Sequence, residues 1–286
     1  MAPAKISEAE ALALTGLFIQ HGPVVQLRER SGHIEVLDDP EDAPVYNGPL
    51  AVLVNRYSAS ASEIFAGAIQ DYHRGVIIGQ NTFGKGTVQN LIPLDRWSNQ
   101  PVDGQLTVTI GKFYRVTGQS TQHRGVIPNI VLPSPIDPKL VGESALPRSL
   151  PWDTIGAVPF PVATGTAAVP SIVTLQQDEL TRQQHDPNFQ WLVGDIQLID
   201  SMRAQKSVSL NLADRQAARR KRDAELLALD NRRRAALGLK PLAHSRQIGG
   251  KDDKIPDVIL DQAEAVMADM IRLDARRSTP QVARGS

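Results

Sequence analysis

The chain has 286 residues, 41% of them hydrophobic, and its 31 Lys and Arg residues balance 31 Asp and Glu residues. This length suits one large domain or a domain with an extension, and zero net charge gives no global field that favours nucleic acid or a membrane surface. Cysteine is absent, which excludes disulfides, thiol catalysis and zinc sites built from Cys. We see no apolar run of about 18 residues that would predict a membrane span, and no signal peptide.

Helix and strand patterns alternate through the first half of the chain. Ser7 and Glu10 have capping-box spacing and open an apolar helix. Two apolar runs flank an amphipathic helix at residues 50–78, which indicates a βαβ unit. The strand at 106–110 alternates and should be half buried. In chain order we expect a helix at 7–18, strands at 24–30, 33–37 and 50–54, a helix at 61–73, and strands at 76–78, 86–91, 106–110, 113–116 and 125–131.

The second half of the chain has a different composition. Prolines recur between Pro133 and Pro170, which predicts an extended connector. Helices follow at about 187–200, capped by Asp186, then at 211–237 and 256–276. A stripe in the first of these helices should be buried, namely Trp191, Leu192, Ile196 and Ile199. The sequence therefore predicts an α/β core at 1–132, a connector at 133–170 and an α-helical extension at 171–286.

The strongest chemical pattern is a serine at the start of the 61–73 helix, followed by a lysine between two glycines. Ser60 lies where helical N–H groups and the positive end of the helix dipole favour a developing oxyanion, with the Ala61 backbone N–H as the expected donor. Lys85 would serve as general base if burial lowers the pKa of its amine. This pair fits a Ser–Lys hydrolase. The alternative is an ordinary capping box of Ser60 and Glu63, with Lys85 exposed on a turn.

Two more polar residues are candidate supporting groups. Asp71 comes eleven residues after Ser60, or about 16 Å along a helix. That separation excludes a direct hydrogen bond, so we expect Asp71 to fix the loop that carries Lys85, or else to be a solvated carboxylate. On a straight strand Gln89 would lie about 13 Å from Lys85, and a bend at Gly86 would let its amide orient the lysine.

Other polar clusters predict no ligand. The six histidines are scattered without metal-ligand spacing, so no metal or cofactor is expected. Two arginine-rich runs, at 219–222 and 232–234, could bind phosphate. Acidic residues interleave with them and aromatic residues are lacking, so we interpret both runs as a solvated helix face rather than a nucleic-acid site.

The amino-acid sequence around Ser60 and Lys85 resembles that of the tail-specific, or C-terminal processing, serine peptidases. The resemblance is long and ordered and extends over nearly the whole chain. It is carried by residues 48–50 and 58–65, Gln70-Asp71-Tyr72, residues 82–89, Lys112-Phe113-Tyr114-Arg115, Ser120-Thr121-Gln122, residues 125–128 and residues 151–155.

This resemblance implies a crotonase-like fold for the protease core. It implies that Ser60 is the nucleophile and Lys85 the general base, that Gln89 orients the lysine and that Asp71 supports them. It also implies a periplasmic location, protein substrates with unstructured apolar C-termini and a possible adaptor protein. The charge pattern described above predicts no nucleic acid as a partner.

Three features depart from the family pattern. No PDZ domain precedes the first helix, residues 1–6 stand where a Gly-rich loop supplies a second oxyanion donor, and Asn129 replaces the usual aspartate. We therefore expect the chain to be the C-terminal part of a longer protease. Loss of one oxyanion donor costs roughly a hundredfold in rate, so the chain alone should be weakly active. The alternative is an inactive fragment that acts as a scaffold or interaction module.

Overall fold

The computed structural model describes residues 7–39, 43–97, 103–250 and 253–278. The chain divides into two compact units, and each is described by itself. The first unit comprises Met1–Val131, Ile136–Ile172 and Met270–Ser286, and the second comprises Leu132–Pro135 and Val173–Asp269. Residues 1–6, on which the prediction about the Gly-rich loop depends, lie outside the described residues.

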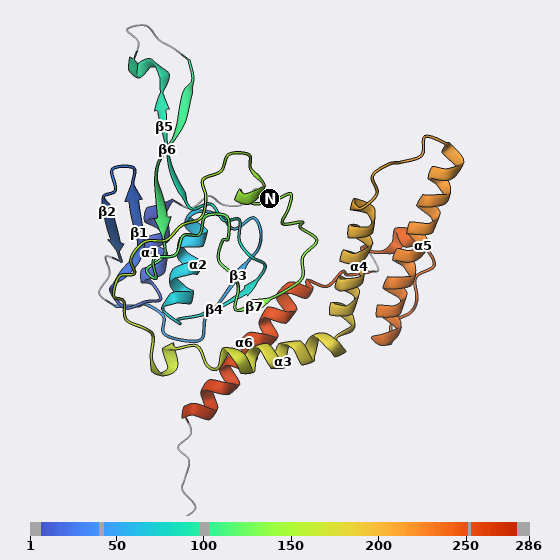
Figure 1. The fold of residues 1–286 in the computed structure, drawn as a ribbon. Helices are drawn as coiled ribbons and strands as arrows, with labels where there is room; N and C mark the ends of the chain where they lie inside the picture. The colour runs from blue at the N-terminus through green and yellow to red at the C-terminus, as the bar shows by residue number, and fades with distance from the viewer. Residues whose placement is uncertain (1–6, 40–42, 98–102, 251–252, 279–286) are drawn as a thin grey trace, which may run out of the picture. The chain divides into compact units, whose positions relative to one another are not determined.

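The first unit contains a parallel sheet with strand order β3-β4-β7 (Figure 1). Helix α2 (Ala61–Asp71) connects β3 (Ala51–Val54) to β4 (Val76–Gly79), and β7 (Ile130–Val131) pairs with the far side of β4. All four residues of β4 are buried, as is usual for a central parallel strand. The predicted βαβ unit is therefore confirmed.

Helix α1 (Glu8–Gly16) packs against α2 to form the main apolar core. The predicted capping box is present, with the Ser7 N–H donating to Glu10 and the Glu10 N–H donating to Ser7. The most buried members of this core come from α1, β1, α2 and β4 and from the residues around the end of β6, and they include Ala11, Val24, Val25, Ile64, Ala66, Ile69, Ile77, Phe113 and Val116.

The same unit contains an antiparallel sheet with strand order β2-β1-β6-β5. Strands β1 (Pro23–Glu29) and β2 (Ile34–Asp38) form the predicted hairpin. Strand β5 (Thr87–Pro93) leads through a short 3-10 helix, η1 (Leu94–Trp97), towards β6 (Gln105–Tyr114).

The outer part of β6 corrects one prediction. We expected a half-buried strand at 106–110, but Leu106 is 49% exposed and Ile110 is 38% exposed. Strand β1 pairs with β6 only from Gly111 to Tyr114, so the outer residues of β6 pair with β5 alone. Figure 1 shows these two strands as a ribbon that extends beyond β1 and β2. A two-stranded ribbon has no second layer against which an alternating face can be buried.

The proline-rich residues 136–171 form neither α-helices nor named strands. They contain two 3-10 helices, η2 (Glu143–Ala145) and η3 (Gly165–Ala167), and an isolated bridge pairs Thr154 with Gln119. They are nevertheless part of the first unit, and Val158 and Phe160 pack against its apolar core. Proline content predicted the lack of sheet but not this packing.

The second unit is helical and contains α3 (Ile172–His185) from Val173 onward, α4 (Pro187–Arg203), α5 (Leu212–Ala236), η4 (Ser245–Gln247) and α6 (Val258–Ser278) up to Asp269. Asp186 caps α4 through the Asn188 N–H at 2.8 Å. Gly238, with φ of 69°, follows the end of α5 as predicted.

Two predictions for the second unit are corrected. The stripe on α4 is half-buried rather than buried, because among the described residues of that helix Phe189 alone is buried. Arg233 and Arg234 do not belong to a solvated face, because both are buried and both pair with Asp253. Within the described ranges, no helix is long and apolar enough to cross a membrane.

Candidate active site

Ser60 occupies a strained turn between β3 and α2. Its φ is 58° and its ψ is −117°, and such a left-handed φ costs a non-glycine residue about 1–3 kcal/mol. A sharp strand-to-helix turn of this kind exposes the serine hydroxyl in nucleophile elbows. Ala61 is the first residue of α2, so the helix itself offers its N–H no acceptor. The turn thus combines a strained serine with a helix N-terminus.

Glu63, in the first turn of α2, connects Ser60 to Lys85. Its side chain is fully buried. The Oε2 atom accepts hydrogen bonds from the Ser60 backbone N–H at 2.8 Å and from the Lys85 backbone N–H at 2.9 Å. Because a single oxygen atom accepts both bonds, the backbones of Ser60 and Lys85 lie side by side.

The second oxygen of Glu63 also accepts two hydrogen bonds. Oε1 accepts from the Gly84 backbone N–H at 2.7 Å and from the Thr82 hydroxyl at 2.5 Å. The Thr82 oxygen accepts the Val126 N–H at 2.7 Å, which leaves its own proton to donate to Glu63. Burial raises the pKa of Glu63, and the hydrogen bonds from its four donors act in the opposite direction.

Residues 84–86, which we call the glycine turn, carry Lys85. The N–H of the preceding Phe83 donates to the Ser58 carbonyl at 2.8 Å, a second link to the Ser60 turn. Gly84 has φ of 89°, and a Cβ at this position would lie 2.8 Å from the backbone carbon of His123, so glycine is required. The Lys85 side chain is half-buried. The structure joins the two turns, and proton transfer between their side chains remains a prediction.

Asp71 lies at the opposite end of α2 from Ser60. Its two oxygens accept from the Arg115 guanidinium at 2.6 and 2.9 Å. Burial raises the pKa of Asp71, while the hydrogen bond and positive charge of Arg115 lower it. The structure thus places Asp71 against Arg115 rather than against the loop that carries Lys85.

Gln89 lies on the exposed part of β5. Its register partner is Thr109, and its amide donates to the Thr109 hydroxyl at 3.4 Å. The strand pairing shifts register between Val88 and Gln89, whereas Gln89 was expected to reach the lysine only through a bend at Gly86. The structure therefore places the Gln89 amide beside Thr109 and not beside Lys85.

Sequence reasoning missed three buried polar residues around the site: Thr82, Arg56 and Gln122. Arg56 donates to the Thr82 carbonyl at 2.5 Å and to the Val141 carbonyl at 2.6 Å. Burial lowers the pKa of Arg56, and the charge of Glu63 raises it. All three lie within or next to the residues that carry the family resemblance. That position in the sequence is the signal that could have identified them.

Known proteases are similar to this chain over part or most of its length. The chain is 42% identical over 266 residues to the tail-specific protease of Haemophilus influenzae, covering 92% of this chain and 38% of that protein. It is 38% identical over 134 residues to a carboxy-terminal-processing protease of Bartonella bacilliformis, covering 46% of this chain and 30% of that protein. A solved photosystem II D1 C-terminal processing protease superposes with a TM-score of 0.39 at 28% identity, over 47% of this chain and 32% of that one.

Two family matches divide the chain in sequence. Residues 7–132 match peptidase family S41, and residues 136–272 match the C-terminal domain of tail specific protease. The first match contains the Ser60 turn and the glycine turn, and the second begins within the proline-rich stretch. The chain is therefore similar to the tail-specific proteases of peptidase family S41 along nearly its whole length, and it spans about a third of the length of the curated relatives that it matches.

Proposed function

We propose that the chain carries the catalytic centre of a serine endopeptidase, with Ser60 as nucleophile and Lys85 as general base. The observation that best supports this is the double hydrogen bond to Glu63 Oε2, which joins the backbones of Ser60 and Lys85. The strained backbone of Ser60 at the start of α2 is the second support. The similarity to peptidase family S41 supplies the reaction class.

The reaction follows from these positions. The neutral Lys85 amine takes the proton of the Ser60 hydroxyl, and the oxygen attacks the carbonyl carbon of the scissile peptide. The Ala61 N–H donates to the oxyanion that forms. The protonated lysine then gives its proton to the leaving amine, and an ester to Ser60 remains. Water, deprotonated by Lys85, attacks this ester, and the protonated lysine returns its proton to the leaving Ser60 oxygen as the new C-terminus is released.

We propose that the substrates are proteins with unstructured, apolar C-terminal tails. The names of the relatives, which refer to tails or carboxy-termini, support action at a C-terminus. The unstructured and apolar character of the tail is supported by the family resemblance alone. Periplasmic location and assistance by an adaptor protein are further proposals, supported by the family resemblance alone. Fractionation of cells and co-purification of the full-length gene product would test them.

A cleavage assay with the full-length gene product tests the proposed function. The substrate is a small folded protein with an apolar C-terminal tail, and its matched control carries a charged tail. We expect cleavage of the first substrate, and no cleavage by Ser60→Ala or Lys85→Ala. A fluorophosphonate should label Ser60 in the wild type and nothing in Ser60→Ala. Cleavage by folded Ser60→Ala would overturn the assignment, and a folded wild type that neither cleaves nor labels would favour the scaffold interpretation.

A further inference from the structure

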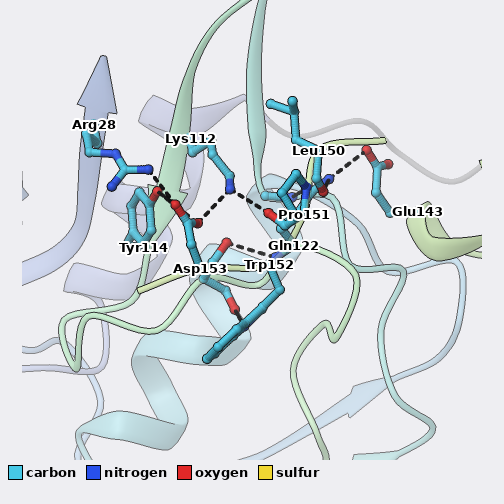
Figure 2. A network of polar contacts seen from close by, with 11 residues as sticks. Arg28, Lys112, Tyr114, Gln122, Glu143, Leu150, Pro151, Trp152 and Asp153 are labelled. Atoms are coloured by element: carbon cyan, nitrogen blue, oxygen red, sulfur yellow. Dashed lines mark hydrogen bonds and ion pairs between the residues drawn. The ribbon is translucent and has the colours of Figure 1, made fainter. Parts of the chain in front are cut away.

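Gln122 is a fully buried side chain that contacts the glycine turn, as Glu63 does. Its Oε1 atom accepts the Gly86 backbone N–H at 2.8 Å. Its Nε2 atom donates to Glu143 Oε1 at 3.2 Å and to the Leu150 carbonyl at 2.9 Å. Figure 2 shows Gln122 together with Glu143 and Leu150, its partners on the stretch that runs from Glu143 to Asp153. One amide thus links the glycine turn to the proline-rich region.

Two buried side chains hold the three successive N–H groups of the glycine turn. Glu63 accepts those of Gly84 and Lys85, and Gln122 accepts that of Gly86. Glu63 belongs to helix α2, whereas Gln122 follows β6 of the antiparallel sheet. Unpaired buried N–H groups cost about 1–3 kcal/mol each. The position of the Lys85 backbone therefore depends on both acceptors.

The partners of Gln122 lie on the 143–153 segment, which is fastened to the antiparallel sheet. Asp153 accepts from Arg28 at 2.5 Å, from Lys112 at 2.6 Å and from the Tyr114 hydroxyl at 3.0 Å. Figure 2 shows these donors converging on the Asp153 carboxylate. Burial raises the pKa of Asp153, but hydrogen bonds from Lys112, Arg28 and Tyr114 outweigh it and hold the pKa below its usual value.

Further contacts hold both ends of the 143–153 segment. At its start, the Glu143 N–H donates to the Phe83 carbonyl at 3.0 Å, next to the glycine turn. Near its end, the Trp152 indole N–H donates to the Ser120 carbonyl at 2.9 Å, two residues before Gln122. This segment belongs to the region that matches the C-terminal domain of tail specific protease, not to the S41 match.

We propose that Gln122 is a positioning residue for Lys85 and that the 143–153 segment acts through it to hold the glycine turn in a productive conformation. The inference rests on the proposed role of Lys85 as general base. A misplacement of about 1 Å in an active site can cost a hundredfold in rate. A segment of the C-terminal family domain would thus control the catalytic rate, and release of that segment would lower activity without altering Ser60, Lys85 or Glu63.

The kinetic test compares two buried glutamines in the full-length gene product. Gln122→Met removes the acceptor of the Gly86 N–H. Gln26→Met is the matched control, since Gln26 is also buried and donates to the carbonyls of Arg115 and Gly156, at 3.1 Å each. We expect Gln122→Met to lower kcat by about ten- to a hundredfold with little change in KM. The Gln26 variant should lose stability but keep its kcat. Equal kcat values for the two folded variants would overturn the proposal.

A double-mutant cycle tests whether the 143–153 segment acts through Gln122. Asp153→Asn should lower kcat in the wild-type background and have no further effect in Gln122→Met, because the link is already broken. If the factors by which the two single substitutions lower kcat multiply in the double variant, the segment does not act through Gln122. If Gln122→Met does not fold, the exchange Gln122→Glu with Glu143→Gln replaces it. We expect the exchange to recover part of the kcat lost in Gln122→Glu alone, because the new amide at position 143 can donate to the new carboxylate at position 122, whereas the Leu150 carbonyl stays without its donor. No recovery would count against the link.

A measurement that needs no activity separates this inference from the proposed function. Hydrogen exchange of the peptide 83–88 should quicken in Gln122→Met and Asp153→Asn, and should not change in Gln26→Met. Unchanged exchange in the first two variants would overturn the positioning role even in an active enzyme. If exchange quickens in these variants but Lys85→Ala keeps full activity, Gln122 does position the glycine turn. In that case the assignment of Lys85 as general base is wrong.

Discussion

The two ends of helix α2 each carry a buried carboxylate, and the two have different partners. Glu63, in the first turn, accepts three backbone N–H groups and a hydroxyl from the turns that carry Ser60 and Lys85. Asp71, in the last turn, faces the guanidinium of Arg115. Burial raises the pKa of both carboxylates. Burial and a raised pKa therefore do not distinguish the two carboxylates, whereas the identity of their donors does.

The helix dipole sharpens this difference. A carboxylate is favoured at the N-terminal end of a helix and disfavoured at the C-terminal end. Glu63 therefore gains from the dipole and has backbone donors, while Asp71 opposes the dipole and depends on a positive side chain. We infer that Glu63 organises the site and that Asp71 stabilises the fold.

Among the carboxylates compared, the largest effect on activity is expected from Glu63→Gln. The amide places an NH₂ group opposite backbone N–H donors, so at least one buried donor loses its acceptor at a cost of about 1–3 kcal/mol. The Ser60 and Lys85 backbones then separate, and we expect kcat/KM to fall by about a hundredfold. Steady-state cleavage of an apolar-tailed substrate by the full-length gene product measures this. Wild-type kcat/KM in the folded variant would contradict the organising role of Glu63.

Asp71→Asn should lower the stability of the fold and leave the activity nearly unchanged. Breaking a buried ion pair by removing one charge costs about 3–5 kcal/mol, and the side chains of Asp71 and Arg115 are 7% and 15% exposed. We expect the free energy of unfolding in urea to fall by about 3 kcal/mol, with kcat in the folded fraction nearly unchanged. A variant of wild-type stability that has lost its kcat would place Asp71 in the catalytic machinery after all.

The sequence predicted those parts of the fold that depend on local pattern. The βαβ unit follows from two apolar runs around an amphipathic helix, and Ser60 and Lys85 lie on the predicted turn and loop of that unit. Capping rules located the start of α1 and of α4. These features require information from about ten neighbouring residues, which a single sequence contains.

The partners of the site residues could not be predicted in the same way. Asp71 meets an arginine 44 residues further along the chain, and no periodicity encodes such a pairing. Gln89 pairs with Thr109 next to a register shift between β5 and β6, and such a shift depends on both strands. Glu63 was visible as a cap, but its bonds to Gly84 and Lys85 appear only once the two turns are joined.

Asp153 is a third carboxylate, and its contribution to the stability of the fold should depend on pH. Its folded-state pKa lies below the usual value because of its hydrogen-bond donors. It therefore stabilises the fold above the ordinary carboxyl pKa of about 3.9, and this stabilisation is lost as the pH falls through the lower folded-state pKa. Asp153→Asn should flatten the dependence of unfolding free energy on pH below about 4.

Urea unfolding at a series of acidic pH values would measure the effect of Asp153→Asn, with the exposed Asp103→Asn as control. Asp153 is one third exposed, so the difference should be modest. Parallel pH profiles for wild type and Asp153→Asn would show that the converging donors do not stabilise the carboxylate.

The smallest effect is expected from Gln89→Ala. The family resemblance implies that Gln89 orients Lys85, whereas the structure places its amide at 3.4 Å from the Thr109 hydroxyl on an exposed ribbon. Exposed substitutions usually change free energies by no more than about 0.5 kcal/mol, so kcat/KM should change by about twofold at most. Thr109→Ala, which removes the observed partner, is the matched control. If Gln89→Ala lost activity while Thr109→Ala did not, the ribbon would have to rearrange on binding substrate and bring the amide to Lys85.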